Sequence, residues 1–308
     1  MTKKPLQGTG TALVTPFLAD GAIDEKSLRS LVDFQIDNGV DMIIPGATTG
    51  EGVTLTEDER ARLASIVIDR TGGRIPVVVY ASSNSTAKAV QRARKARKLG
   101  AAAILSVGPY YNKPTQQGFY EHFKAIAEAE DIPVIVYNVP ARTGSNIEAR
   151  TMLQLAQIKN IVAVKEASGN LGQIMDILRD RPADFRVLSG DDAFTLAVIA
   201  LGGDGVISVV ANETPGLMSA MVNAALEGNY EKARHLHYRL LPLMNINFIE
   251  SSPIPVKAAL AMMGLIQENY RLPLVPISKP NREKVQAVLE ALSLLNATGA
   301  MHGSGKGN

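Results

Sequence analysis

Short runs of β-branched residues alternate with amphipathic helical patterns from residue 8 onward, and this alternation limits the possible folds more than any other feature. It is typical of parallel α/β proteins, because two parallel strands need a long crossover, usually a helix, between them. Eight strands are predicted, over residues 9–15, 40–44, 75–80, 102–107, 133–138, 161–165, 185–189 and 204–208. Eight βα units ending near residue 228 predict a closed (β/α)8 TIM barrel of the α/β class.

Helices are predicted between these strands, over residues 25–38, 57–70, 85–99, 115–129, 147–157, 171–179, 192–201 and 215–226. Asp24 and Thr56 are the expected N-caps of the first two, because their side-chain oxygens can accept hydrogen bonds from free backbone N–H groups. A doubly wound open sheet is the alternative fold. It is disfavoured because residues 14–17, after the first strand, read VTPF and not G-x-G-x-x-G.

The strand pattern stops after residue 228, and helical patterns follow at residues 230–247, 253–263 and 278–297. We therefore expect a (β/α)8 catalytic barrel over residues 1–228 and a small C-terminal helical domain over residues 229–297. Residues 298–308 are rich in glycine and polar residues, a composition that predicts a disordered tail.

Charge and cysteine content exclude several classes of protein. Lys and Arg number 32 against 30 Asp and Glu, so the net charge of +2 favours neither a nucleic-acid nor a membrane partner. The basic run at residues 91–98 has helical spacing and is expected to be a solvated helix face. The absence of cysteine excludes disulfides, thiolate metal sites and a cysteine nucleophile. With no signal-peptide pattern and no apolar run of about 18 residues, we expect a soluble, cytoplasmic protein.

Lys165 is the candidate nucleophile. It ends the run Ile-Val-Ala-Val at residues 161–164, which is apolar on both faces, as in a strand buried in a parallel sheet. An ammonium group among apolar walls is poorly hydrated, which lowers its pKa, and the neutral amine is the form that attacks a ketone to make an imine. The alternative is a lysine that reaches solvent or pairs with Glu166.

Polar residues that follow the other strands are the next candidates, because the reactive groups of a barrel lie at the carboxyl ends of its strands. Residues 46–52 read GATTGEG, a glycine-flanked turn whose N–H groups could bind a carboxylate while the hydroxyls of Thr48 and Thr49 relay a proton. An ordinary turn before the next helix is the alternative.

Tyr137 ends the fifth strand and Arg142 follows it, so a proton donor or acceptor and a bidentate carboxylate ligand are expected near the lysine. A buried, hydrogen-bonded tyrosine and a solvated arginine are the alternatives. Tyr111 follows the fourth strand, at the expected barrel mouth. Residues 189–192 are expected to cap a helix, although Gly190 would also let a ligand approach the backbone closely.

Lysine, tyrosine, threonine and arginine thus meet at one end of the predicted barrel. None of the four histidines falls at a predicted strand end, so neither a metal nor another cofactor is expected. The simplest chemistry that these groups share is activation of a carbonyl through an imine. A 2-keto acid on the lysine loses a proton to give an enamine, which attacks an aldehyde.

These motifs are recognisable together. Residues 46–51, 107–114, 137–144, 164–167 and 253–257 resemble the pyruvate-dependent N-acetylneuraminate lyase superfamily and, within it, the dihydrodipicolinate synthase family. The resemblance extends over nearly the whole chain. It implies a homotetramer, a dimer of dimers, that condenses pyruvate with aspartate semialdehyde through a Schiff base, in lysine and diaminopimelate biosynthesis.

The resemblance also implies roles for individual residues. Lys165 matches the imine-forming lysine and Tyr137 the proton-shuttling tyrosine, while Thr48 matches the relay threonine. Tyr111 matches a relay tyrosine that the family contributes across a subunit interface, so that a complete site would need at least a dimer.

The implied substrate-binding residues are Thr49, Arg142, Gly190 and Ile207. Thr49 matches the residue that helps to hold the pyruvate carboxylate, and Arg142 matches the arginine that binds the carboxylate of the semialdehyde. Gly190 and Ile207 match backbone positions that line the pocket.

Regulation is expected to differ from that of lysine-inhibited members of the family. Those members commonly carry a histidine and a glutamate where this chain has Arg60 and Lys88. Two cations would repel a lysine ammonium group, and an acceptor for it would be lost. The sequence therefore predicts weak or absent feedback by lysine.

Two other functions remain open from the residues alone. The barrel could be an aldolase or dehydratase for a sugar-derived 2-keto acid, of the N-acetylneuraminate lyase or 2-keto-3-deoxygluconate aldolase type. It could also be a noncatalytic sensor of a keto acid. The proton-relay residues argue against a sensor, and Arg142 favours the semialdehyde over a sugar acid.

Overall fold

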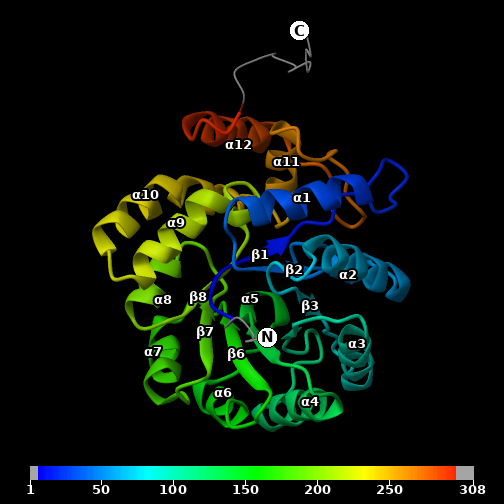
Figure 1. Ribbon diagram of the computed structural model, residues 1–308, viewed down its shortest axis with the longest axis vertical. Helices are drawn as coiled ribbons and strands as arrows, with labels where there is room; N and C mark the ends of the chain where they lie inside the picture. Colours follow the sequence, from blue (N-terminus) through cyan, green and yellow to red (C-terminus); the bar gives the residue numbers. More distant parts are fainter. Residues whose placement is uncertain (1–5, 296–308) are drawn as a thin grey trace.

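The eight predicted strands are present and form one parallel barrel (Figure 1). The structure is a computed structural model and describes residues 6–295. In the sheet the strands follow the order β2-β1-β8-β7-β6-β5-β4-β3, and a bridge between Ile43 and Val77 joins β2 to β3. The strands are β1 (Gly8–Leu13), β2 (Met42–Pro45), β3 (Val78–Tyr80), β4 (Ala103–Val107), β5 (Val134–Asn138), β6 (Ile161–Glu166), β7 (Arg186–Ser189) and β8 (Gly205–Ser208). The closed barrel is confirmed, and the open sheet is excluded.

Helices surround the barrel, as the alternating pattern predicts (Figure 1). Asp24 caps α1 by accepting from the N–H of Ser27, and Thr56 forms a capping box with Glu59 at the start of α2. The helices of the barrel are α1 (Glu25–Asp37), α2 (Glu57–Thr71), α3 (Thr86–Lys98), α4 (Gln116–Ala129), α5 (Pro140–Thr143), α6 (Ala149–Leu155), α7 (Leu171–Asp180), α8 (Thr195–Ala200) and α9 (Pro215–Leu226), with short 3-10 turns η1 (Gly52–Thr54) and η2 (Val210–Asn212).

The turn after β7 differs from the prediction. Residues 189–192 were expected to cap a helix starting at Asp192, but α8 begins three residues later, at Thr195. Asp192 instead accepts hydrogen bonds from the backbone N–H groups of Val209 and Val210, beyond the end of β8. A carboxylate can accept hydrogen bonds from free N–H groups at the start of a helix or after the end of a strand. Here the position of β8 beside β7 places the carboxylate of Asp192 at the N–H groups that follow β8.

The strands are apolar on both faces because each face is buried. Inward residues such as Leu105, Ile135 and Leu188 fill the barrel, whereas outward residues such as Val136 and Val164 pack under the helices. Burying each such side chain stabilises the fold by roughly 1.5–3 kcal/mol. The carboxyl ends of the strands are left as the place where polar side chains can gather.

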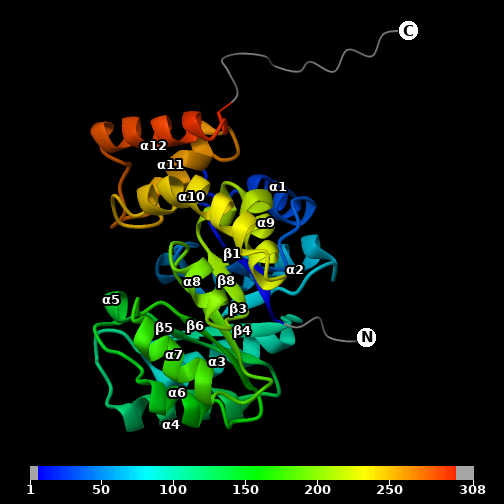
Figure 2. The ribbon, with the colours of Figure 1, turned by 90° about the vertical axis from the view of Figure 1, so that its left-hand side faces the viewer.

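Three helices follow the barrel: α10 (Tyr230–Ile246), α11 (Ile254–Met262) and α12 (Lys279–Ala291). The first, α10, lies beside α9, and α11 and α12 lie beyond α1 and α9 (Figure 2). One hydrophobic cluster runs from Met218 and Met221 of α9 through Leu240 and Ala258 to Val285 of α12. The core is therefore continuous across residue 228, and the domain boundary there stays a prediction. The predicted tail at residues 298–308 lies outside the described residues.

Candidate active site

The register of β5 and β6 brings the two principal predicted residues together. Tyr137 and Lys165 are directly paired across these neighbouring parallel strands, near their carboxyl ends. Because side chains alternate between the two faces of a strand, paired residues point to the same side, which here is the barrel interior. The amine of Lys165 lies 4.4 Å from the centroid of the Tyr137 ring.

Lys165 is almost fully buried, with 4% of its surface exposed. Burial lowers the pKa of its amine to about 8, partly opposed by the negative charge of Asp192. The cause is desolvation, because the charged form loses water that the apolar walls do not replace. At neutral pH the neutral amine, which is the form that attacks a carbonyl, is thus far more populated than in a solvent-exposed lysine.

Glu166 does not pair with Lys165. Its carboxylate lies on the other face of β6, where it accepts hydrogen bonds from the Asn138 amide, the Ser168 backbone N–H and the Gln173 amide. The alternative in which Lys165 is neutralised by its neighbour is therefore wrong. Because successive side chains of a strand point to opposite faces, Glu166 points away from Lys165, and the lysine has no carboxylate partner from its own strand.

A cavity of about 580 Å³ opens beside Lys165 at the carboxyl ends of the strands. Six of the eight predicted site residues line it, from the loops after β2 and β7, from the ends of β5 and β6, and from the helix α5. These are Thr48, Thr49, Tyr137, Arg142, Lys165 and Gly190. A volume of this size suits a small-molecule substrate.

Thr48 and Tyr137 are linked within this cavity. Burial raises the pKa of the Tyr137 phenol to about 12, while Arg142 and a hydrogen bond with Thr48 lower it. The phenol is therefore protonated at neutral pH and can both donate and accept a proton. Tyr137, its ring beside the Lys165 amine, and Thr48 form a short path along which a proton can move.

Arg142 lies at the cavity rim, on the short helix α5 that directly follows β5. The sequence did not predict α5, because four residues are too few to show a helical period. Its guanidinium donates a long hydrogen bond of 3.5 Å to the carbonyl of Ser252 and is otherwise open to the cavity. It is placed to bind a carboxylate that enters from solvent.

Gly190 permits the close packing of the turn after β7 on the nucleophile. A Cβ atom at this position would lie 2.6 Å from the Ala167 Cβ and 3.1 Å from both Cγ and Cε of Lys165. A side chain there would clash with Ala167 and crowd the lysine stem. The glycine is therefore required by the position of Lys165.

Two predicted residues do not line the cavity of the single chain. Ile207 is buried in β8 among the residues that fill the barrel interior. Tyr111 is 89% exposed, on the loop after β4, with a backbone φ of 74°. The role of each stays a prediction.

The segment between α10 and α11 also borders the cavity and was not predicted from the sequence. Phe248, Ile249, Glu250, Ser251 and Ser252 form one side of the cavity, although they lie more than 80 residues beyond Lys165. Their only signal in the sequence was the proline-containing motif at residues 253–257 that directly follows them.

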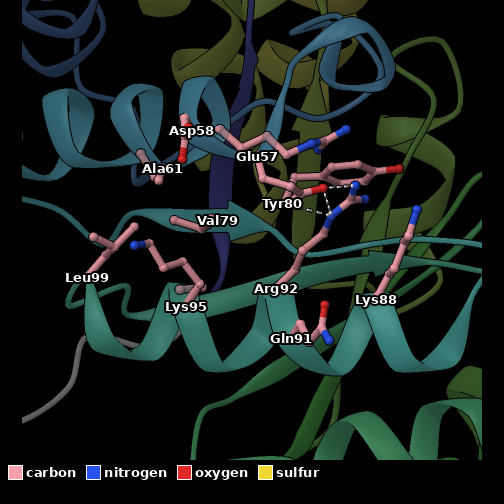
Figure 3. Close-up of a pocket in the computed structure, with 13 residues that line it drawn as sticks. Glu57, Asp58, Ala61, Val79, Tyr80, Lys88, Gln91, Arg92, Lys95 and Leu99 are labelled. Atoms are coloured by element: carbon pink, nitrogen blue, oxygen red, sulfur yellow. Dashed lines mark hydrogen bonds and ion pairs between the residues drawn. The ribbon is translucent and has the colours of Figure 1, made fainter.

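A second cavity, of about 350 Å³, lies between α2 and α3 (Figure 3). It contains Arg60 and Lys88, the two residues from which weak or absent inhibition by lysine is predicted. Arg60 and Lys88 line it together with Arg92, which pairs with Glu57. The pKa of Arg60 is lowered by burial and by the like charge of Arg92. The basic run contributes the exposed face of α3, as predicted.

Among residues 6–295, no three His, Cys, Asp or Glu side chains gather closely enough to hold a metal ion. None of the helices in the described part of the chain is long and apolar enough to cross a membrane.

Comparison with known proteins agrees with the motifs. The model of the dihydrodipicolinate synthetase family matches residues 5–292. A 4-hydroxy-tetrahydrodipicolinate synthase of Koribacter versatilis is 54% identical over 295 residues, covering 95% of this chain and 98% of that protein. The crystal structure of dihydrodipicolinate synthase from Thermotoga maritima aligns with a TM-score of 0.93 at 45% identity, covering 95% of this chain and 100% of that one. The structure from Aquifex aeolicus gives 0.92 at 44% identity, covering 94% and 99%.

A family model that spans almost the entire chain, with relatives of this identity and coverage, confirms the resemblance inferred from the motifs. The chain belongs to the dihydrodipicolinate synthetase family.

Proposed function

We propose that the chain is a 4-hydroxy-tetrahydrodipicolinate synthase, which condenses pyruvate with L-aspartate 4-semialdehyde in lysine and diaminopimelate biosynthesis. The observation that carries this proposal is the buried Lys165, its pKa lowered to about 8, beside Tyr137 in a cavity of substrate size. The names of the relatives support the choice of substrates.

The reaction begins with attack of the neutral Lys165 amine on the ketone carbon of pyruvate. Loss of water gives a protonated imine, which withdraws electrons from the adjacent methyl group. Removal of one methyl proton gives an enamine, and its terminal carbon forms the new bond to the aldehyde carbon of the second substrate. The aldehyde oxygen takes up a proton as this bond forms. The amino group of the semialdehyde then attacks the imine carbon, which closes the ring and releases the Lys165 amine.

Tyr137 and Thr48 are assigned to the proton transfers. A phenol that stays protonated at neutral pH can donate to the oxygen that leaves as water and then accept a proton. The Thr48 hydroxyl, hydrogen-bonded to it, carries the proton onward. Thr49, next in the same turn, is assigned to the pyruvate carboxylate, while Gly190 and Ile207 are assigned to the pocket wall.

Tyr111 is assigned to the same relay in a second subunit. In the single chain this large aromatic side chain is almost fully exposed and does not line the chain's own cavity. A neighbouring copy that covered it would bury its ring and bring the hydroxyl toward a second site. We propose a cytoplasmic homotetramer, a dimer of dimers, in which Tyr111 completes the partner's active site.

The direct test is the rate of condensation of pyruvate with aspartate semialdehyde, coupled to the NADPH-dependent reductase that consumes the product. A fast rate that requires Lys165 supports the reaction and the substrate together. If there is no rate while borohydride still traps pyruvate on Lys165, the substrate assignment is wrong and a sugar-acid lyase takes its place.

Arg142→Ala should separate the two substrates. We expect kcat/KM for the semialdehyde to fall roughly 100-fold, because the substrate carboxylate loses a charge-assisted bidentate partner. Trapping of pyruvate on Lys165 should stay within about 3-fold of the wild type, because Arg142 lies at the rim. Arg150→Ala, an exposed arginine on α6, is the control for loss of positive charge. Equal losses in both assays would contradict this role for Arg142.

Lysine should inhibit the enzyme weakly or not at all. The cavity between α2 and α3 presents Arg60, Lys88 and Lys95, and its lining carboxylates are those of Asp58 and of Glu57, which pairs with Arg92 (Figure 3). A ligand with an ammonium group would be repelled by these cations, and neither Arg60 nor Lys88 can accept a hydrogen bond from it. The check is the initial rate at saturating substrates over a lysine titration. Half-inhibition by lysine below about 1 mM, where binding is worth only about 4 kcal/mol, would contradict the prediction.

A further inference from the structure

A buried ion pair outside the proposed catalytic set holds the turn at residues 46–52, which we call the threonine turn, to the C-terminal helices. The Lys257 amine of α11 lies 2.5 Å from a carboxylate oxygen of Glu51, and the two side chains are 0% and 1% exposed. The second Glu51 oxygen accepts from the backbone N–H of Arg271 at 3.4 Å. The pair joins residues 206 positions apart in the chain.

The surroundings of Lys257 fix its amine in place. The amine lies 4.5 Å from the centroid of the Phe17 ring and 5.1 Å from that of Tyr270, so aromatic faces surround the charge. A buried ion pair contributes little to stability compared with well-packed apolar residues, because both charges lose their water. Its presence at this position therefore points to a requirement of geometry.

Glu51 anchors a tightly packed turn, in which the Thr15 hydroxyl and the Arg60 guanidinium also hold the carbonyls of Gly50 and Gly52. Its backbone is left-handed, with a φ of 51°, a conformation that disfavours any residue with a side chain. The glycines on either side leave no room for a side chain: a Cβ on Gly50 would lie 2.8 Å from the Leu13 carbonyl oxygen, and one on Gly52 only 1.8 Å from that of Gly46. The carboxylate of Glu51 ties this turn to the C-terminal helices.

The turn transmits this position to the relay threonine. The backbone N–H of Glu51 donates to the carbonyl of Thr48 at 3.1 Å, and the Thr15 hydroxyl holds the carbonyl of Gly50 at 2.7 Å. Thr48 is in turn hydrogen-bonded to Tyr137. A shift of Glu51 would therefore move the Thr48 hydroxyl relative to the phenol.

We infer that Lys257 is a positioning residue, which holds the threonine turn through Glu51 so that Thr48 meets Tyr137. The inference rests on the proposed function for the role of Thr48. It predicts that Lys257→Met lowers kcat by about 10- to 100-fold, the effect expected of a displacement of about 1 Å in a reacting constellation. The KM for pyruvate should rise by a smaller factor than kcat falls, because Thr49 lies in the same turn whereas Lys165 and the other cavity walls come from other strands.

The decisive experiment is a double-mutant cycle with Thr48→Val, run at a temperature where all variants are folded by circular dichroism. If Lys257 acts through Thr48, adding Lys257→Met to Thr48→Val should lower kcat by less than about 2-fold further. A purely structural role would give the same factor in both backgrounds, and that result would overturn the inference. Arg62→Met, which breaks the exposed pair with Glu25, is the matched control and should leave kcat unchanged.

Two provisions keep the test decisive. If Lys257→Met does not fold, Glu51→Gln replaces it, because glutamine keeps the shape of the side chain and one accepting oxygen. Glu51→Gln should then lower kcat by at least about 3-fold, and this loss should vanish in the Thr48→Val background. Exchange of the pyruvate methyl protons with D2O is measured beside condensation, because it needs the imine and the relay but no aldehyde. Exchange without condensation in the wild type would refute the proposed second substrate. The double-mutant cycle, measured by the rate of proton exchange, would still support or overturn the role of Lys257.

Discussion

Lys165→Ala is expected to lower kcat by at least about 10⁴-fold and to abolish trapping of pyruvate by borohydride, because no other group can form the imine. The cavity places one lysine amine beside Tyr137, and its low pKa is a consequence of burial. Mass spectrometry after reduction measures the adduct directly. The rate measured with the coupling reductase gives the loss of turnover.

Lys159→Ala is the matched control, since this exposed lysine lies just before the same strand. It should keep wild-type turnover and a full adduct. The pH dependence provides a second readout, because only the neutral amine attacks. Trapping should therefore quicken as the pH is raised toward about 8 and level off above it. An adduct that persists in Lys165→Ala would show that another lysine is the nucleophile.

Tyr137→Phe is expected to lower kcat by about 10²- to 10⁴-fold, the usual contribution of a general acid–base group. The substitution removes one oxygen and keeps the ring beside the lysine amine, so the packing of the barrel interior is retained. The adduct with pyruvate should still form on prolonged incubation, because the nucleophile is intact. The rates of trapping and of methyl-proton exchange should both fall.

Tyr80→Phe is a suitable comparison, because Tyr80 is another buried tyrosine in the same interior cluster and does not line the active-site cavity. Its loss of kcat should be within about 3-fold, whereas Tyr137→Phe should lose far more. Similar losses in the two variants would mean that the hydroxyl of Tyr137 serves packing and has no part in the proton transfers.

Local pattern was sufficient for the barrel and for most of the candidate site. Strand and helix periods are properties of neighbouring residues, and eight successive βα units leave few ways to bury their apolar faces other than closure. Closure then brings the carboxyl ends of all strands to one rim. Lys165 and Tyr137, each at a strand end, could therefore be predicted to lie near each other even though the sequence contains no distances.

The orientation of residues within a strand required the structure. The run at residues 161–164 is apolar on both faces, so no alternation shows which of Lys165 and Glu166 points inward. The pairing of β6 with β5 and β7 decides it, placing Lys165 in the cavity and Glu166 among Asn138 and Gln173.

Contacts between distant segments were also beyond the sequence. Phe248 to Ser252 border the cavity, and Lys257 anchors the threonine turn, only because the C-terminal helices dock on the barrel. Asp192 meets the N–H groups after β8 instead of capping its own helix for the same reason. By itself the sequence thus determined the elements, the barrel and the strand ends where chemistry gathers, because these follow from local periodicity and chain order. Tertiary structure alone decided which side chains face the cavity and what holds them there, because those contacts join residues whose separation in the chain carries no periodic signal.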